Sequence, residues 1–177
     1  MKLLRTIRLD ASDTFIFPVA AEPGDWAISG AFAFDAVPET LTGRKLAAFR
    51  GGFLGIPSLG WSTLVQVVDA DAGDRAAAID LLARCLSERY GAPDLEAARA
   101  AAAEELDFAA SLAEHPTGTL IAVRRTLETD TIREAFRTLQ PRMDSGAWRA
   151  FAFGEATAEE EAMEGIDLTG LARGEHS

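Results

Sequence analysis

The sequence predicts a single α+β domain in which an antiparallel or mixed sheet is covered by a helical hairpin. Four segments with the pattern of strands lie within the first 68 residues. Two long segments with helical periodicity follow between residues 73 and 112, and a further strand comes after them. A run of strands followed by a run of helices is typical of α+β folds and not of alternating parallel folds. The length of 177 residues suits one domain.

The first part of the chain is predicted to form four strands and one helix. Each strand has either alternating apolar residues or a run of β-branched residues. Proline and glycine separate most of them, as is usual at turns. The predicted strands are Lys2–Leu9, Thr14–Phe17, Trp26–Phe34 and Thr63–Val68, and the helix is Pro38–Arg50, with Pro38 as its first residue.

The helical hairpin is predicted from apolar residues that recur every three or four positions. Its first helix spans Gly73–Tyr90, with Asp74 as N-cap and Gly91 as the left-handed residue that ends it. The second helix spans Leu95–Leu112, is capped by Asp94 and is rich in alanine. Because alanine is small, this helix allows a neighbouring element to approach closely.

The last part of the chain has weaker patterns. Thr119–Leu127 is predicted to be a strand. Thr131–Leu139 is either a helix or an edge strand, and we favour the helix because Ile132, Phe136 and Leu139 then point inward. We place the α+β domain at residues 1–142 and a partly ordered, acidic C-terminal extension at residues 143–177. Within the extension, a short strand over Trp148–Phe153 and an acidic helix over Glu155–Glu164 are expected.

Composition and charge exclude several classes of protein. The net charge of −11 repels polyanions, which argues against a nucleic-acid partner. The first ten residues lack the apolar core of a secretory signal, and no segment has about 18 uninterrupted apolar residues, so we expect no membrane partner and a cytoplasmic location. Cys85 is the only cysteine and the two histidines are far apart, so we expect no disulfide framework, metal site or cofactor.

The glycine-rich stretch from Gly51 to Trp61 does not match a nucleotide-binding loop. Its glycines have the spacing of a phosphate-binding loop, but Trp61 stands where the lysine is required. Two alternatives stay open. The apolar residues of this stretch either pack in the core or form an exposed patch through which the protein self-associates, as a homodimer, or binds another protein. The candidate interface residues are Phe53, Leu54, Ile56, Leu59 and Trp61.

A group of arginines near the end of the predicted domain is a candidate site for a small anionic ligand. Guanidinium groups bind carboxylates and phosphates in a bidentate manner. On a helix, Arg133 and Arg137 share a face, and one of two adjacent strand arginines is expected to join them. The alternative is a solvated face, or a surface that docks the glutamate-rich segment. The candidate residues are Arg124, Arg125, Arg133, Arg137, Arg142 and His115.

No arrangement of catalytic residues is evident in the sequence. Cys85 lies beside an apolar helical stripe and is expected to be a structural thiol. Ser62 lacks the GxSxG context of a serine nucleophile, and the sequence after Asp69 and Asp71 does not continue as a calcium-binding loop. His115, which precedes a proline, is expected to end a helix in preference to acting as a base. We therefore expect a protein that is not an enzyme.

Three stretches carry a family resemblance. They are KLLRTIRLDASDTF, GFLGIPSLGWSTLVQVV and HPTGTLIAVRRT…IREAFRTLQPR. Together, from Met1 to about Arg142, they resemble an uncharacterised bacterial family of small cytosolic proteins, a domain of unknown function. Such proteins are encoded near accessory genes for molybdenum-dependent oxidoreductases, including a lipoate-ligase-like protein, so the resemblance implies an accessory role and transfers no functional residue.

Two functions are compatible with these observations. The first is a non-catalytic accessory or interaction protein that self-associates through the apolar glycine-rich stretch. The second is a small-molecule anion-binding protein or enzyme that uses the arginine group.

Overall fold

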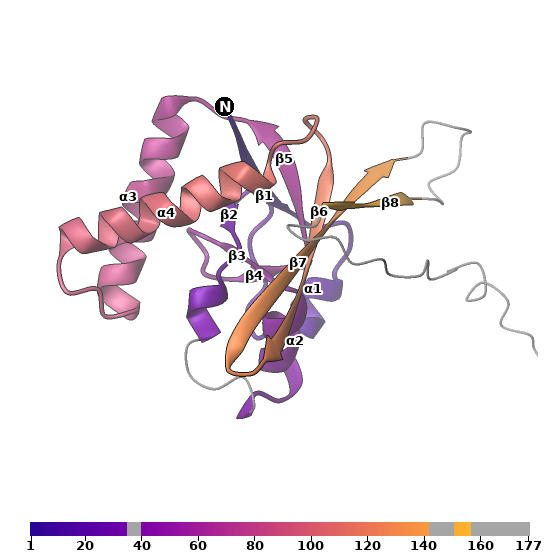
Figure 1. The fold of residues 1–177 in the computed structure, drawn as a ribbon, viewed down its shortest axis with the longest axis horizontal. Helices are drawn as coiled ribbons and strands as arrows, with labels where there is room; N and C mark the ends of the chain where they lie inside the picture. The colour runs from indigo at the N-terminus through magenta and orange to yellow at the C-terminus, as the bar shows by residue number, and fades with distance from the viewer. Residues whose placement is uncertain (35–39, 142–150, 157–177) are drawn as a thin grey trace, which may run out of the picture.

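The computed structural model describes residues 1–34, 40–141 and 151–156. It contains one eight-stranded sheet with the order β4-β3-β2-β1-β5-β6-β7-β8, and every neighbouring pair of strands is antiparallel. Helices cover this sheet (Figure 1), so the predicted α+β class is confirmed. The strands are β1 Lys2–Ile7, β2 Trp26–Ile28, β3 Phe53–Gly55, β4 Trp61–Ser62, β5 Leu64–Asp69, β6 Leu120–Glu128, β7 Thr131–Pro141 and β8 Phe151–Ala156. The helices are α1 Ser12–Ile16, the 3-10 helix η1 Ala31–Phe34, α2 Gly43–Gly51, α3 Ala72–Arg89 and α4 Leu95–Leu112.

The strand order divides the sheet into two meanders. Strands β1 to β4 pair in sequence order, and strands β5 to β8 do the same. The two meanders join along β1 and β5, whose register runs from Lys2 opposite Asp69 to Ile7 opposite Leu64. The helical hairpin of α3 and α4 is inserted between β5 and β6, at the start of the second meander.

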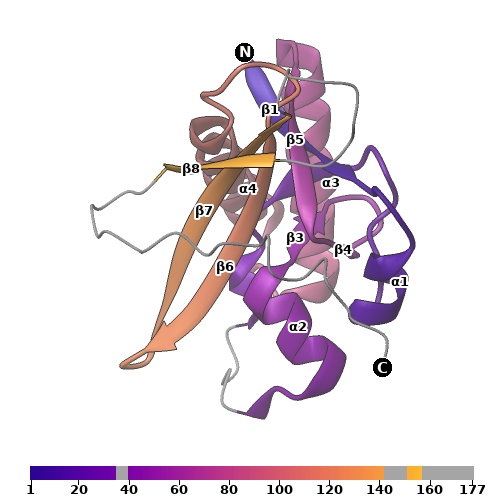
Figure 2. The ribbon, with the colours of Figure 1, turned by 90° about the vertical axis from the view of Figure 1, so that its right-hand side faces the viewer.

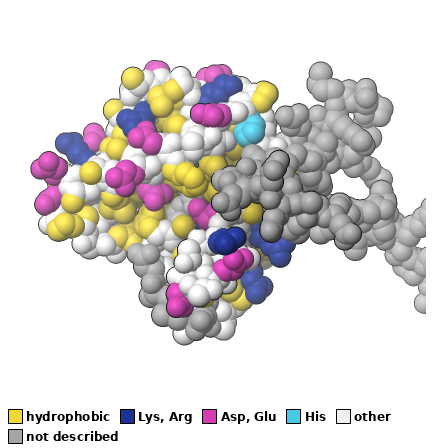
Figure 3. Space-filling view, viewed as in Figure 1, with side chains coloured by type: hydrophobic (Ala, Val, Ile, Leu, Met, Phe, Trp, Pro, Cys, Tyr) yellow, Lys and Arg dark blue, Asp and Glu magenta, His cyan; other side chains and the backbone are white. Residues whose placement is uncertain are grey.

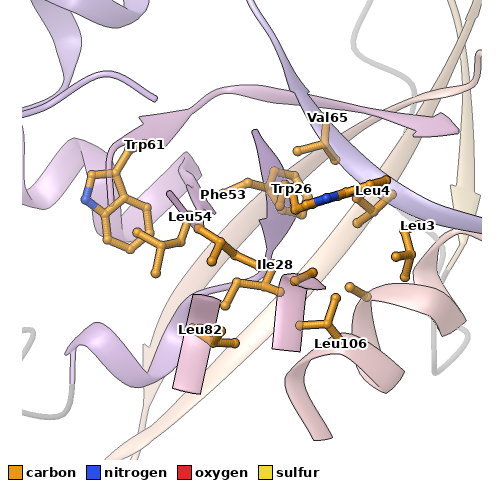
Figure 4. Close-up of a cluster of buried hydrophobic side chains, with 14 of the residues drawn as sticks. Leu3, Leu4, Trp26, Ile28, Phe53, Leu54, Trp61, Val65, Leu82 and Leu106 are labelled. Atoms are coloured by element: carbon orange, nitrogen blue, oxygen red, sulfur yellow. The ribbon is translucent and has the colours of Figure 1, made fainter. Parts of the chain in front are cut away.

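The helical hairpin packs against the first meander. Helix α4 lies across β1 and β2, and α3 packs on α4 on the side away from β6 and β7 (Figures 1 and 2). In Figure 4, Leu82 of α3 and Leu106 of α4 lie beneath Ile28 of β2, and Leu3 and Leu4 of β1 continue the same cluster. These five side chains are at most 1% exposed, so the hairpin and the sheet share one core.

The ends of α3 and α4 follow from their sequences. Asp71, not the predicted Asp74, is the N-cap of α3, and Asp74 occupies the third helical position of a capping box with it. Asp94 caps α4, as predicted, by accepting a hydrogen bond from the backbone N–H of Ala97 at 2.7 Å. Gly91 follows α3 with a φ of 71°, the left-handed conformation predicted for it.

One strand predicted in the first part of the chain is wrong, and a second is shorter than predicted. Thr14–Phe17 overlaps helix α1, which is held by the buried carboxylate of Asp13; its Oδ1 accepts a hydrogen bond from Thr63 Oγ1 at 2.5 Å. The strand predicted over Trp26–Phe34 ends at Ile28, because Gly30 has a φ of 76° and the chain then turns into η1. The alternation of apolar residues in the sequence indicated neither helix α1 nor the turn at Gly30.

The segment Thr131–Leu139 is a strand and not the favoured helix. It lies within β7, which pairs with β6 from Glu128 opposite Thr131 to Leu120 opposite Leu139. The connection is a two-residue turn in which both Thr129 and Asp130 have positive φ, 47° and 64°. Such a turn matches the twist of a β-hairpin, so the two strands continue directly into each other.

Other expectations lie partly outside the described residues. The predicted helix Pro38–Arg50 begins only at Gly43, with Thr42 as its N-cap position, and Pro38 lies in the undescribed residues 35–39. The backbone of β8 extends the sheet past residue 142, whereas the segment expected as an acidic helix is described only as far as Ala156. Among the residues that the structure describes, no helix is long and apolar enough to cross a membrane.

Candidate functional site

Arg125 is the largest fully buried side chain among the described residues, with 1% of the residue exposed. Its Nε donates to Glu134 Oε1 at 2.7 Å. Its Nη1 donates to the carbonyl oxygens of Phe49 at 3.1 Å and Gly52 at 2.7 Å. Its Nη2 donates to the carbonyl and the hydroxyl oxygen of Ser29. A guanidinium has five N–H donors, and all five are used here, so Arg125 has none left for an anionic ligand.

The remaining candidate arginines lie on the other face of the β6–β7 hairpin. Side chains alternate along a strand and cross-strand partners share a face. The register places Arg124 opposite Ala135, Arg133 opposite Thr126 and Arg137 opposite Ala122, so these three arginines share the face opposite to Arg125. Basic side chains are grouped near this hairpin in Figure 3. Arg133 is exposed and forms an ion pair with Glu128, with Nε 2.9 Å from Oε2.

Of the two other residues of the predicted anion site, Arg142 lies outside the described residues and His115 does not join this group. His115 lies in the connection from α4 to β6, and its carbonyl oxygen accepts a hydrogen bond from Lys2 Nζ at 2.6 Å. The four residue steps from Leu120 to Arg124 span roughly 13 Å along β6. His115, which precedes that strand, is therefore separated from the arginines.

The glycine-rich stretch packs in the core. Phe53, Leu54 and Ile56 are at most 1% exposed and Trp61 is 9% exposed, while Leu59 is partly buried against the same cluster. Figure 4 shows Leu54 beside Trp61 in that cluster. The sequence left open whether these side chains pack in the core or form an exposed patch. Their burial corresponds to the core.

The glycines of this stretch permit close packing of the backbone. A Cβ added to Gly52 lies 2.9 Å from both the carbonyl oxygen of Ala48 and a ring carbon of Trp61, which is closer than real Cβ atoms come. A Cβ added to Gly51 meets only the carbonyl oxygen of Val123, at 3.8 Å, an ordinary contact. Gly52 therefore lets Trp61 lie against the end of α2.

A groove of about 390 Å³ lies between η1, the end of α3 and the first half of α4. Its volume is within the range of small-molecule sites. Most of the groove is apolar, and the charged group in its lining is the carboxyl of Glu105. We call it the α3–α4 groove. Its lining residues are Phe32, Leu86, Tyr90, Ala92, Pro93, Ala97, Ala101 and Glu105.

Glu105 is a half-buried carboxyl with no hydrogen bond to any described residue. Burial against apolar neighbours and the negative charge of Glu134 raise its pKa to about 7, although Arg125 acts in the opposite direction. The arginine cannot turn toward Glu105, because its donors are all engaged. Near neutral pH, this carboxyl is therefore divided between its charged and neutral forms.

The other titratable groups near the groove favour their neutral forms. Burial raises the pKa of Tyr90, whose ring packs edge-to-face on Phe32 with centroids 5.1 Å apart. Burial also raises the pKa of Cys85, whose Sγ lies 3.9 Å from the carbonyl oxygen of Ile56. A thiol in this setting is a weak nucleophile. Within the described ranges, no three His, Cys, Asp or Glu side chains are grouped to hold a metal ion.

A second surface feature lies around α1. Four large apolar side chains are exposed within eleven residues of sequence: Leu9 by 58%, Phe15 by 71%, Ile16 by 41% and Val19 by 55%. We call them the α1 apolar patch. The chain after the patch runs beside the edge strand β4, where Ala20 forms a parallel bridge with Trp61. Exposed apolar side chains that are this close in sequence are candidates for contacts with other molecules.

The comparison with known proteins gives one family. A family model described as a family of unknown function, DUF6505, matches residues 1–158, which include every strand of the sheet. The chain belongs to DUF6505. No curated protein and no solved structure matches it.

Within this DUF6505 domain, sequence reasoning missed Glu105. The signal present was its position in α4: Glu105 lies three residues after Ala102 and four before Ala109, both buried. It therefore stands at the border of the buried stripe and not on the solvated side of the helix. Its other neighbours in the groove come from η1 and from the end of α3, and no local pattern places them beside α4.

Proposed function

We propose that this protein is a non-catalytic accessory protein that binds a small ligand with an apolar body in the α3–α4 groove. The observation that carries the proposal is an open, mostly apolar groove of about 390 Å³ with a carboxyl at its wall that forms no hydrogen bond within the described part of the chain. Apolar walls provide binding energy, and a single polar group fixes the orientation of a ligand. Binding sites for small molecules have this composition.

The arrangement of arginines supports this groove over the anion site expected from the sequence. The donors of Arg125 are satisfied inside the protein, and Arg133 is exposed and paired with Glu128. Exposed ion pairs of this kind contribute little binding energy. Arg124 and Arg133 are exposed, so an anion bound by these two arginines stays in contact with water.

The accessory part of the proposal comes from the family resemblance. The stretches noted in the sequence resemble proteins encoded beside accessory genes for molybdenum-dependent oxidoreductases. In this setting the ligand passes to or from a partner enzyme in the cytoplasm, and the domain needs no catalytic group of its own.

The test is the binding of a neutral, environment-sensitive naphthalene dye. We expect saturable binding with a blue shift in emission, because the dye leaves water for apolar walls. Ala101→Trp fills the groove and should abolish binding. Ala100→Trp, on an exposed position of the same helix that does not line the groove, is the control and should bind the dye as the wild type does. Absence of saturable binding, or equal loss in both variants, contradicts the proposal.

The α1 apolar patch favours a second function, self-association into a homodimer. Phe15 is 71% exposed, and an aromatic ring in such a position is typical of interface centres. Two copies of the same apolar patch are complementary by symmetry. This surface takes the role that the sequence suggested for Phe53 to Trp61.

The mass of the protein in solution tests this second function. We expect a dimer for the wild type and a folded monomer for Phe15→Ser with Val19→Ser, measured by light scattering over a range of concentrations. Leu81→Ser, which removes an exposed apolar side chain elsewhere, is the control and should remain dimeric. A wild-type protein that stays monomeric at high concentration removes this function.

A further inference from the structure

We propose that the ligand of the α3–α4 groove is a small organic cation, a protonated amine on an apolar or aromatic body, whose ammonium group pairs with Glu105. This inference rests on the proposed function, since it names the class of molecule for the same groove.

Among the described residues, no cationic side chain forms an ion pair with Glu105. The charges of Glu134 of β7, Arg125 of β6 and Glu104 of α4 act on it. Arg125 and Glu134 already form an ion pair, with Nε 2.7 Å from Oε1, and Glu134 also accepts a hydrogen bond from the hydroxyl of Ser29. When Glu105 is ionised, two carboxylates therefore share one arginine. A cation in the groove balances the excess negative charge.

The lining of the groove suits a cation better than an anion. Phe32 and Tyr90 bring two aromatic rings to the groove, and the faces of aromatic rings attract ammonium groups. An anionic ligand meets the charge of Glu105 at close range and finds no free donor on Arg125. The net charge of −11 also raises the local concentration of cations around the molecule.

Binding of a cation changes the protonation of Glu105. Burial and Glu134 raise the pKa of the empty site to about 7. A nearby ammonium group favours the carboxylate and lowers that pKa, so binding at neutral pH releases part of a proton from Glu105 to the buffer. A ligand that accepts a hydrogen bond from the neutral acid raises the pKa and takes up a proton instead. The direction of proton transfer distinguishes the two kinds of ligand.

The experiment compares three probes of similar shape by calorimetry: 2-phenylethylamine, 2-phenylethanol and 3-phenylpropionate. Titrations at pH 7 in two buffers with different ionisation enthalpies count the protons exchanged. We expect the amine to bind about tenfold more tightly than the alcohol and to release protons, whereas the carboxylate binds more weakly than both.

Two variants locate the effect. Glu105→Gln should bring the affinity for the amine down to that for the alcohol in the same variant and abolish the proton release. Glu104→Gln, one residue away on the exposed side of α4, should keep the preference for the amine. Equal binding of amine and alcohol, or a preference for the carboxylate with proton uptake, overturns the cation inference and leaves the groove as a binding site. Binding of none of the three probes, together with no binding of the naphthalene dye, removes the proposed function as well.

Discussion

Arg125 and Glu134 face each other across β6 and β7, with the arginine side chain entirely buried and the glutamate side chain 17% exposed. The guanidinium also joins the end of α2 to the chain after β2, through the carbonyl oxygens of Gly52 and Ser29. One side chain of the second meander thus satisfies backbone groups of the first. Its role is to hold the two together.

Replacing Arg125 by methionine should lower the free energy of unfolding by about 3–5 kcal/mol, because it removes the cation that pairs with the carboxylate of Glu134 and the donors that three carbonyl oxygens accept from. Urea denaturation measures the loss. Arg124→Met is the matched control: this neighbour is exposed on the opposite face, and its replacement should change stability by less than about 0.5 kcal/mol. Similar losses in the two variants contradict the role of Arg125.

The stability of Glu105→Gln relative to the wild type should be greater at pH 8 than at pH 4. The folded protein holds the Glu105 proton up to a pKa of about 7, above the ordinary value of 4.5, so wild-type stability is fully present below that ordinary value and falls as the pH rises through the window from 4.5 to 7. Allowing for partial exposure, the advantage of glutamine should grow by about 1–2 kcal/mol across this window. Urea midpoints at a series of pH values measure it, and a constant difference between the two proteins is the contrary result.

Gly52→Ala should destabilise the protein by about 1–3 kcal/mol, whereas Gly51→Ala should be close to neutral. The added methyl at position 52 lies 2.9 Å from the carbonyl oxygen of Ala48 and from the ring of Trp61, so one of them must move. At position 51 the nearest atom is 3.8 Å away. Thermal unfolding of the two variants tests this difference between adjacent residues, and equal melting temperatures count against the packing described for Trp61.

The β6–β7 turn should be improved by the pair Thr129→Asn with Asp130→Gly. Both positions have positive φ, which asparagine and glycine adopt more easily than a β-branched threonine. We expect a gain of about 1 kcal/mol in the free energy of unfolding, measured in urea. Asp130→Gly alone should give part of the gain, and a double variant that loses stability is incompatible with the turn geometry.

Periodicity was sufficient where an element has one clear apolar face. The helices α3 and α4 and the strands β5 and β6 were predicted close to their observed bounds, because their buried residues recur at regular intervals. Strand β1 was also predicted closely, although the adjacent Leu3 and Leu4 are both buried. The sum of these elements also gave the fold class. The predicted bounds were less accurate for α2, which was expected to begin at Pro38 and begins at Gly43.

Strand β7 was mistaken for a helix because of the buried ion pair. Its inward positions are Ile132, Glu134, Phe136 and Thr138, which pair with residues on the buried face of β6 or lie beside them. Two of the four are polar, so the alternation expected for a strand is hidden. Glu134 is tolerated there only because Arg125 lies opposite, a fact that becomes visible once the two strands are paired.

The candidate site was less accessible to sequence reasoning than the fold. The arginines were expected to lie together. On the observed strands, Arg125 points to the opposite face from Arg124, and Arg133 and Arg137 share the face of Arg124. The α3–α4 groove depends on how η1 approaches the helical hairpin. That approach is a tertiary property, set by packing between segments some sixty residues apart.

The pairing of β1 with β5 has a consequence for how the chain folds. Each meander closes between neighbouring segments, but the seam joins residues roughly 60 apart in sequence and must form before the sheet is continuous. Closing so long a loop costs conformational entropy, and this cost comes before the contacts that offset it have formed. Folding is slower as a result. During synthesis, Leu3 and Leu4 emerge well before Val65 and Val67, so the first apolar strand must remain unpaired on that side, and open to misfolding or chaperone binding, until β5 has left the ribosome.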